Sequence, residues 1–190
     1  MGQLSANNQK QNSAKATGAA AARGKSNALR PISAAVLAEM RAAVSERYFY
    51  TDESARRACG QDETEDLVYM PEAVAEPASA QEVSALMKIC YRERIPVTVR
   101  GAGSGLAGGA LPIAGGLVMS MKRLDKILHL DDKNFQVTVE PGMITETLQN
   151  TLKEQGLFYP PDPASRGWSF IGGNVSTNAG GPKAVKYGVV

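Results

Sequence analysis

A glycine-rich stretch directly after an apolar run is the part of this sequence best suited to bind a ligand. It spans residues 100–112, follows the apolar run at residues 95–99, and carries five glycines between positions 101 and 109. Glycine lets a backbone approach a ligand closely and adopt a positive φ without strain. Consecutive exposed amides form a concave site for an anion, most often a phosphate, and Arg100 adds a charge-assisted hydrogen bond. The stretch predicts an anion-binding loop, and the plain alternative is a mobile surface loop.

Two common phosphate-binding patterns do not explain this stretch. Gly103, Gly105 and Gly108 have the spacing of the Rossmann fingerprint, which requires a helix whose N-terminus holds the pyrophosphate. Pro112 and the flanking glycine pairs oppose a regular helix at this place. No Gly-Lys-Ser/Thr closes the loop, so the Walker pattern is absent too. We therefore expect a phosphate loop that lies between two strands.

A second region of similar character lies between residues 159 and 181. Residues 160–163 read Pro-Pro-Asp-Pro, and this run is stiff because proline fixes φ. A stiff loop of this kind is suited to line one side of a binding site for a planar ligand, and Ser165 adds a hydroxyl. Residues 171–181 then combine glycines with small neutral donors. We expect a Gly/Asn-rich loop beside a planar ligand, the alternative being a mobile loop.

Three segments, in this order, resemble a known family. Residues 100–106 read RGAGSGL, residues 159–165 read YPPDPAS, and residues 171–181 read IGGNVSTNAGG. They are similar to the FAD-linked oxidases that have a PCMH-type (vanillyl-alcohol-oxidase-like) FAD domain. The nearest branch contains the FAD subunit of glycolate oxidase, D-lactate dehydrogenase and D-2-hydroxyglutarate dehydrogenase. The similarity extends over about residues 32–190, and the first segment resembles the pyrophosphate loop.

The resemblance implies that FAD is the cofactor and that all three segments, with the turn after them, contact it. In some relatives a histidine of the pyrophosphate loop holds FAD covalently; the matching residue here is Ser104, so noncovalent FAD is expected. The cofactor-binding residues implied are Arg100, Gly101, Ala102, Gly103, Ser104, Gly105, Leu106, Gly109, Ala110, Pro161, Asp162, Ser165, Gly172, Gly173, Asn174, Ser176, Thr177, Asn178, Gly180, Gly181, Tyr187 and Gly188.

The resemblance also implies an oxidoreductase that oxidises a small 2-hydroxy acid, such as D-lactate or glycolate, by hydride transfer to flavin N5. Family members are longer, and their substrate domain and catalytic base lie beyond the position of Val190. We therefore expect a fragment that is inactive alone, with no catalytic residue assigned and a C-terminal partner polypeptide as complement. The alternative is a noncatalytic module that binds a nucleotide or a partner. No metal and no nucleic acid are expected.

Strands and helices alternate in the first half of the chain. A strand at residues 73–77 precedes a helix that begins at a capping box formed by Ser79 and Glu82. Buried strands at residues 95–99 and 116–121 then enclose the glycine-rich stretch. This order predicts a βαβ unit.

The second half reads differently. Residues 127–130 and 136–140 predict antiparallel strands around a polar turn, and residues 145–155 predict a helix that Thr145 caps. His129, the single histidine, is expected to be structural. After the Gly/Asn-rich loop, Tyr187 and Gly188 are expected to lead into another strand.

Together these elements predict an α+β protein built from α/β subdomains, and the resemblance specifies the PCMH-type FAD-binding fold. The first subdomain, residues 73–121, is expected to be complete, and the second, residues 124–190, truncated. Residues 1–28 predict a disordered tail because they hold almost no large apolar side chains. Residues 29–72 predict a helical lead-in whose first helix is capped by Ser33.

Composition is that of a globular protein, with 43% hydrophobic and 21% charged residues and a net charge of +2. Nothing is long and apolar enough to span a membrane. Cys59 and Cys90 are too few for a disulfide framework and are read as reduced thiols. These features predict a cytoplasmic protein; peripheral membrane attachment stays open, and organellar targeting by the basic tail is the disfavoured alternative.

Overall fold

A computed structural model describes residues 31–190, which form one compact unit. The tail predicted over residues 1–28 lies outside the described residues. The helices are α2 (Ala34–Val44), α3 (Glu53–Cys59), α4 (Ala80–Glu93), α5 (Thr145–Glu154), α6 (Ile171–Thr177) and α7 (Ala184–Tyr187), with a 3-10 turn η1 (Glu46–Tyr48). The strands are β1 (Phe49–Tyr50), β2 (Ala73–Ala75), β3 (Val97–Arg100), β4 (Leu117–Ser120), β5 (Ile127–Asp131) and β6 (Gln136–Val139).

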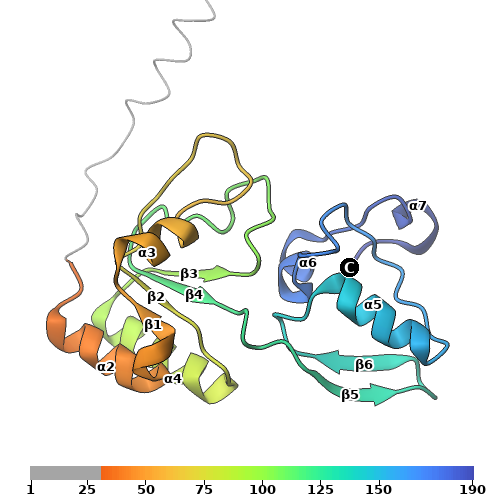
Figure 1. The fold of residues 1–190 in the computed structure, drawn as a ribbon, viewed down its shortest axis with the longest axis horizontal. Coiled ribbons are helices and arrows are strands. Elements are labelled where there is room, and N and C mark those ends of the chain that lie inside the picture. The colour runs from red at the N-terminus through yellow and green to blue at the C-terminus, as the bar shows by residue number, and fades with distance from the viewer. Residues whose placement is uncertain (1–30) are drawn as a thin grey trace, which may run out of the picture. The chain divides into compact units, whose positions relative to one another are not determined.

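The first half of the described chain is built on a four-stranded sheet with the order β1-β2-β4-β3 (Figure 1). Both β2 and β3 pair with β4 in parallel. The helix α4 connects β2 to β3, so the predicted βαβ unit is confirmed. The helices α2 and α4 cover one side of the sheet. Their buried Met40, Val44 and Leu86 pack against Leu117 and Met119 of β4 and form the main core.

The strand β3 differs from its prediction as a buried strand. It forms the edge of the sheet, none of its residues is fully buried, and Val99 is 58% exposed. The apolar run at residues 95–99 is typical of a buried strand, but the strands that are buried throughout are β2 and β4, which have a neighbour on each side. Periodicity reports hydrophobicity and does not tell an edge strand from a central one.

The expected capping box starts α4. The Ser79 hydroxyl accepts a hydrogen bond from the Glu82 amide (3.2 Å), and the Glu82 carboxylate accepts one from the Ala78 amide (2.8 Å). Cys90, near the end of this helix, lies in the main core, and burial raises the pKa of its thiol to about 11. Both cysteines are free thiols, as predicted.

The lead-in contributes a strand to the sheet as well as helices. Ser33 caps α2 through its hydroxyl, as predicted, and Ser45, at φ 73°, ends that helix. The chain then turns so that β1 pairs antiparallel with β2. Residues before 73 thereby complete the first sheet.

The second half packs α5 on the hairpin β5-β6. Leu148 and Leu152 of α5 are buried with Met143 and Ile171, against apolar side chains of both strands. The hairpin turn is held by Asp131, whose carboxylate accepts hydrogen bonds from the Asn134 amide and side chain. Gly156, at φ 72°, follows the helix as expected.

Three local predictions for this half are wrong. Residues 171–177 form helix α6 and not a loop, because Ile171 and Asn174 are buried and hold the segment against its neighbours. Thr145 does not cap α5: its hydroxyl bonds to Ser169 and Asn174, and Ile144 takes the cap position without a side-chain bond. Tyr187 ends the short helix α7, and no strand is formed in residues 188–190.

Candidate functional site

The glycine-rich stretch forms a loop that connects β3 to β4, as predicted. It leaves β3 at Arg100, at the carboxyl edge of the parallel strands, where ligands of open α/β sheets bind. Gly103 and Gly108 have φ values of +77° and +71°, which other residues rarely adopt. The buried Leu111 and Pro112 anchor the far end of the loop. The loop is therefore fixed at both ends and irregular between them.

The amides of this loop point to an anion as the ligand. Within residues 31–190, the amides from Ala102 to Ala107 donate no hydrogen bond to another protein group. A Cβ added at Gly105 or Gly109 would meet no atom within 4 Å, so space is open beside these two positions. Adjacent amides without protein acceptors form a cradle for a negatively charged group.

Arg100 supplies the positive charge of the cradle. Its guanidinium lies directly under Gly103, so closely that a Cβ at that position would overlap it. The Nη1 atom of Arg100 is buried and has no hydrogen-bond partner. Leaving a buried charged donor unpaired costs more than the roughly 1–3 kcal/mol of a neutral one. A bound phosphate would satisfy this group, and the site fits a phosphate-bearing ligand for that reason.

The first predicted segment meets the third at Gly101. A Cβ on Gly101 would lie 3.8 Å from the Cα of Gly173 and from two side-chain atoms of Phe170. The base of the anion loop therefore adjoins the start of α6. Two segments that are about 70 residues apart in the sequence are brought together here.

The second segment meets the third at Asp162. The Asp162 amide donates to the Gly180 carbonyl (2.9 Å), and the backbone at Gly181, with φ +100°, passes so close that a Cβ there would overlap the Asp162 carbonyl oxygen. The Asp162 carboxylate pairs with Lys183 (3.1 Å) and Arg166 (3.2 Å). The hydrogen bond from Lys183 lowers the pKa of Asp162, and Arg166 adds to this effect. These contacts fix the proline loop on the turn after α6.

A buried network of hydrogen bonds connects α6 to the start of α5. The Asn174 side chain donates to the Thr145 hydroxyl (2.6 Å), which in turn donates to the Ser169 carbonyl (3.0 Å). All three residues are buried. The side-chain amide of Asn174 thus donates a hydrogen bond to another residue of the protein. A contact of Asn174 with a cofactor stays a prediction.

The remaining predicted residues differ in exposure and partners. The hydroxyls of Ser176 and Thr177 donate back to the carbonyls of Gly172 and Gly173 within α6. Tyr187 packs edge-on against Phe158, with ring centroids 5.5 Å apart. Leu106 is 78% exposed on the anion loop. The other members of the set are placed as follows: Ser104, Ala110, Ser165, Gly172 and Gly173 are partly exposed, Asn178, Gly109 and Gly188 are exposed, and Pro161 is buried.

Sequence reasoning missed one contact to the loop. Thr64, in the acidic loop between α3 and β2, accepts a hydrogen bond from the Gly108 amide at 2.8 Å. Residues 62–66 of this loop read Asp-Glu-Thr-Glu-Asp, a composition typical of a solvated connection. No local signal marks the contact, because Thr64 and Gly108 are 44 residues apart.

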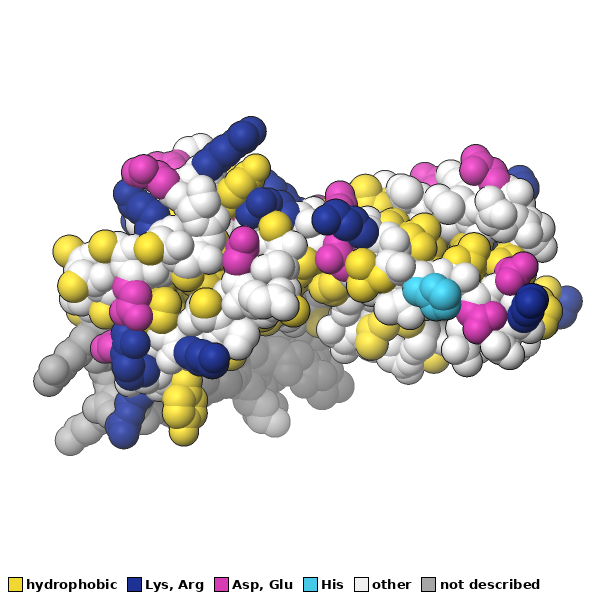
Figure 2. Space-filling view, turned by 90° about the horizontal axis from the view of Figure 1, so that it is seen from below, with side chains coloured by type: hydrophobic (Ala, Val, Ile, Leu, Met, Phe, Trp, Pro, Cys, Tyr) yellow, Lys and Arg dark blue, Asp and Glu magenta, His cyan; other side chains and the backbone are white. Residues whose placement is uncertain are grey.

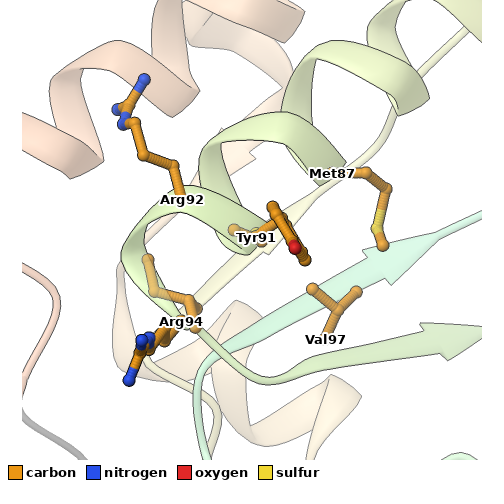
Figure 3. A pocket seen from close by; sticks show the side chains of 7 residues that line it. Met87, Tyr91, Arg92, Arg94 and Val97 are labelled. Atoms are coloured by element: carbon orange, nitrogen blue, oxygen red, sulfur yellow. The ribbon is translucent and has the colours of Figure 1, made fainter.

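Other surface features lie away from these segments. A hollow between the end of α4 and the start of β3 holds none of the predicted residues, and Figure 3 shows Met87, Tyr91 and Val97 gathered in it. His129 is exposed on β5, and Figure 2 shows it at the surface. In residues 31–190, no group of three or more His, Cys, Asp or Glu side chains could hold a metal ion. None of the helices described by the structure has the length and hydropathy needed to cross a membrane.

Known proteins match the part of the chain that carries this site. A family model described as FAD binding domain matches residues 71–190. The chain is 41% identical over 141 residues to the glycolate oxidase subunit GlcD of Bacillus subtilis (strain 168), covering 74% of this chain and 30% of that protein. It is 47% identical over 118 residues to the D-lactate dehydrogenase of Anaerostipes hadrus, covering 62% of this chain and 25% of that protein. The chain spans less than a third of these relatives.

The fold has known counterparts too. A solved structure of alkyldihydroxyacetonephosphate synthase superposes with a TM-score of 0.77 at 22% sequence identity, covering 84% of this chain and 32% of that one. A solved structure of p-cresol methylhydroxylase matches with a TM-score of 0.59 at 20% identity, covering 65% of this chain and 25% of that one. The predicted PCMH-type FAD-binding fold is confirmed by these likenesses and the family match. The unpaired loop amides and the buried Nη1 of Arg100 fit the pyrophosphate of this cofactor. The chain therefore belongs to the FAD binding domain family, and its residues 71–190 form a domain of that family, similar to part of the glycolate oxidase subunit GlcD and of D-lactate dehydrogenase.

Proposed function

We propose that this chain is the noncovalent FAD-binding part of an enzyme that oxidises a small 2-hydroxy acid of the D-lactate or glycolate type. The observation that carries the proposal is the anion cradle, in which unpaired amides from Ala102 to Ala107 lie beside a buried and unpartnered Arg100 nitrogen. Bound FAD would supply the two-electron acceptor that oxidation of an alcohol to a carbonyl requires. The protein would supply binding and orientation.

The residues of the cradle have separate tasks under this proposal. Arg100 neutralises negative charge on the pyrophosphate, and the loop amides donate hydrogen bonds to its oxygens. Gly101 keeps the base of the loop small where it adjoins Gly173 and Phe170. Ser104 takes the place at which some relatives have a histidine bonded to the flavin, and this supports noncovalent binding. The proline loop and the start of α6 are expected to line the ring systems.

The proposed substrate class is based on the names of the proteins to which this chain is similar. Glycolate oxidase and D-lactate dehydrogenase are both named for small 2-hydroxy acids. No catalytic base is assigned in this chain, and its single histidine, His129, is exposed on β5. We expect the base and the groups that bind the substrate carboxylate to lie outside residues 31–190. A cytoplasmic location stays a prediction.

A flavin titration tests the cofactor site. Gly105 has open space around it and no positive φ, so the fold tolerates a side chain there. Gly105→Asp places a carboxylate in the cradle, and Gly105→Asn is its neutral control of the same shape. We expect saturable binding of FAD by the native chain, affinity similar to this for Gly105→Asn, and about tenfold or greater loss for Gly105→Asp. Circular dichroism checks that each variant is folded. Equal affinity of the Asp and Asn variants would contradict the anion cradle.

A second experiment tests the substrate class. A preparation that contains this chain together with the substrate-binding part of the enzyme is loaded with FAD and mixed with D-lactate or glycolate without an electron acceptor. Loss of the visible flavin absorbance with either acid is the expected result, and L-lactate is the control. A complex that binds FAD and is bleached by none of these acids would favour the noncatalytic module.

A further inference from the structure

The acidic loop between α3 and β2 touches the anion loop through one hydrogen bond. The hydroxyl of Thr64 accepts from the amide of Gly108 at 2.8 Å, in a partly buried position. Among the loop amides from Ala102 to Gly108, only this one donates to a protein group within residues 31–190. Figure 1 shows the two connections side by side beyond the ends of the strands. The bond thus joins the loop to a part of the chain that precedes the matched domain.

Gly108 is the point at which the anion loop turns back toward the protein. Its φ is +71°, and its carbonyl accepts from the Leu111 amide at 3.1 Å. Leu111 and Pro112, directly after this turn, are buried. The unpaired amides lie between two fixed points, which are Arg100 at the end of β3 and the turn at Gly108. A constraint on Gly108 therefore constrains the amides before it.

Thr64 is itself held firmly enough to act as such a constraint. The carboxylate of Asp62 accepts from the Thr64 amide (2.9 Å). The acidic loop is closed at its base, where the Tyr69 amide donates to the Gly60 carbonyl (2.8 Å) and the Arg56 side chain donates to the Pro71 carbonyl (2.6 Å). The loop therefore presents the Thr64 hydroxyl in one position.

We propose that Thr64 is a positioning residue for the cofactor site: it holds Gly108 so that the amides from Ala102 to Ala107 keep the arrangement that binds the pyrophosphate. This inference rests on the proposed binding of FAD at the loop. Preorganised donors cost less to order when the ligand arrives. One net hydrogen bond corresponds to a change of roughly 2- to 12-fold in affinity.

The test compares three threonine variants. Thr64→Val keeps the shape and removes the acceptor, Thr64→Ser retains it, and Thr151→Val removes a hydroxyl that bonds only within α5. We expect Thr64→Val to weaken FAD binding by about 3- to 10-fold, with the other two near the native value. In the cofactor-free chain, hydrogen exchange of the Gly108 amide should quicken in Thr64→Val alone, while exchange in β4 and α4 stays unchanged.

The outcomes separate this inference from the proposal on which it rests. If the native chain does not bind FAD, the proposed function fails, yet faster exchange in the loop of Thr64→Val would still establish the tether. If the native chain binds FAD and a folded Thr64→Val binds it equally well, the positioning role is wrong. Should Thr64→Val not fold, Thr64→Ala removes the same acceptor without the branched side chain, and native affinity in that variant would overturn the inference.

Discussion

The two glycine-rich segments of this chain have similar composition and opposite uses of glycine. In the loop from β3 to β4, Gly105 and Gly109 border open space, and the neighbouring amides lack protein partners. In the segment from α6 to α7, glycines let backbone pack on protein: Gly172 against Pro141, at 2.7 Å for an added Cβ, and Gly181 against Asp162. The first segment thus has open space and unpaired amides, whereas Gly172 and Gly181 of the second segment pack against protein backbone. Substitutions should therefore damage binding in one and folding in the other.

The largest expected effect is on folding, in the second segment. Gly181→Ala forces a side chain into a position with φ +100° and onto the Asp162 carbonyl oxygen. We expect a loss of about 2–4 kcal/mol in the free energy of unfolding. Gly105→Ala is the matched control and should change that free energy by less than about 1 kcal/mol. Denaturant unfolding measures both, and equal losses would break the comparison.

An effect of intermediate size is expected at Gly103, where a side chain would disturb both the fold and the anion cradle. Gly103→Ala introduces strain at φ +77° and displaces the Arg100 guanidinium, which is a flexible side chain and not backbone. The free energy of unfolding should fall by about 1–2 kcal/mol. The affinity for FAD, measured by titration below the melting temperature, should fall by about tenfold, because the charge has left the cradle. A variant that loses stability but no affinity would show that Arg100 does not serve the ligand.

The smallest expected effect is a pH dependence in the second segment. The hydrogen bond from Lys183 lowers the pKa of Asp162 in the folded state, so the ionised carboxylate stabilises the fold at pH values above its ordinary pKa of about 4. This contribution is lost as the pH falls below that value and through the lowered pKa. The stability difference between the native chain and Asp162→Asn should be present at pH 7 and shrink below about pH 4.

Urea unfolding at pH 7, 5 and 3 measures that difference. Asp125→Asn, at an exposed position after β4, is the control and should show a smaller difference. A difference that is constant from pH 7 to pH 3 would mean that the ion pair with Lys183 does not stabilise this segment.

Features encoded by neighbouring residues could be predicted from the sequence. Ser79 and Glu82 mark the start of α4, and the turn at residues 131–134 marks the hairpin, because capping and turn bonds are local. The anion loop was recognised because its glycines directly follow a strand. The structure brings the first and the second family segments each into contact with the third.

Features that depend on distant contacts could not be predicted in this way. Two glycines in residues 171–177 oppose a helix by intrinsic propensity, and α6 forms because burial of Ile171 and Asn174 outweighs it. Thr145 has the residue type of a cap, but its hydroxyl is engaged by Ser169 and Asn174. Thr64 was overlooked because its partner lies 44 residues away.

The strand β1 has a practical consequence for where this domain can be cut. The family match begins at residue 71, yet β1 pairs with β2, and Met40 and Val44 of α2 lie in the main core. A polypeptide that starts at residue 71 would leave one edge of β2 without its partner and expose the apolar faces of α4 and the sheet. The folding unit is therefore longer than the stretch that the family model matches, and a truncation meant to isolate the domain should begin no later than residue 31.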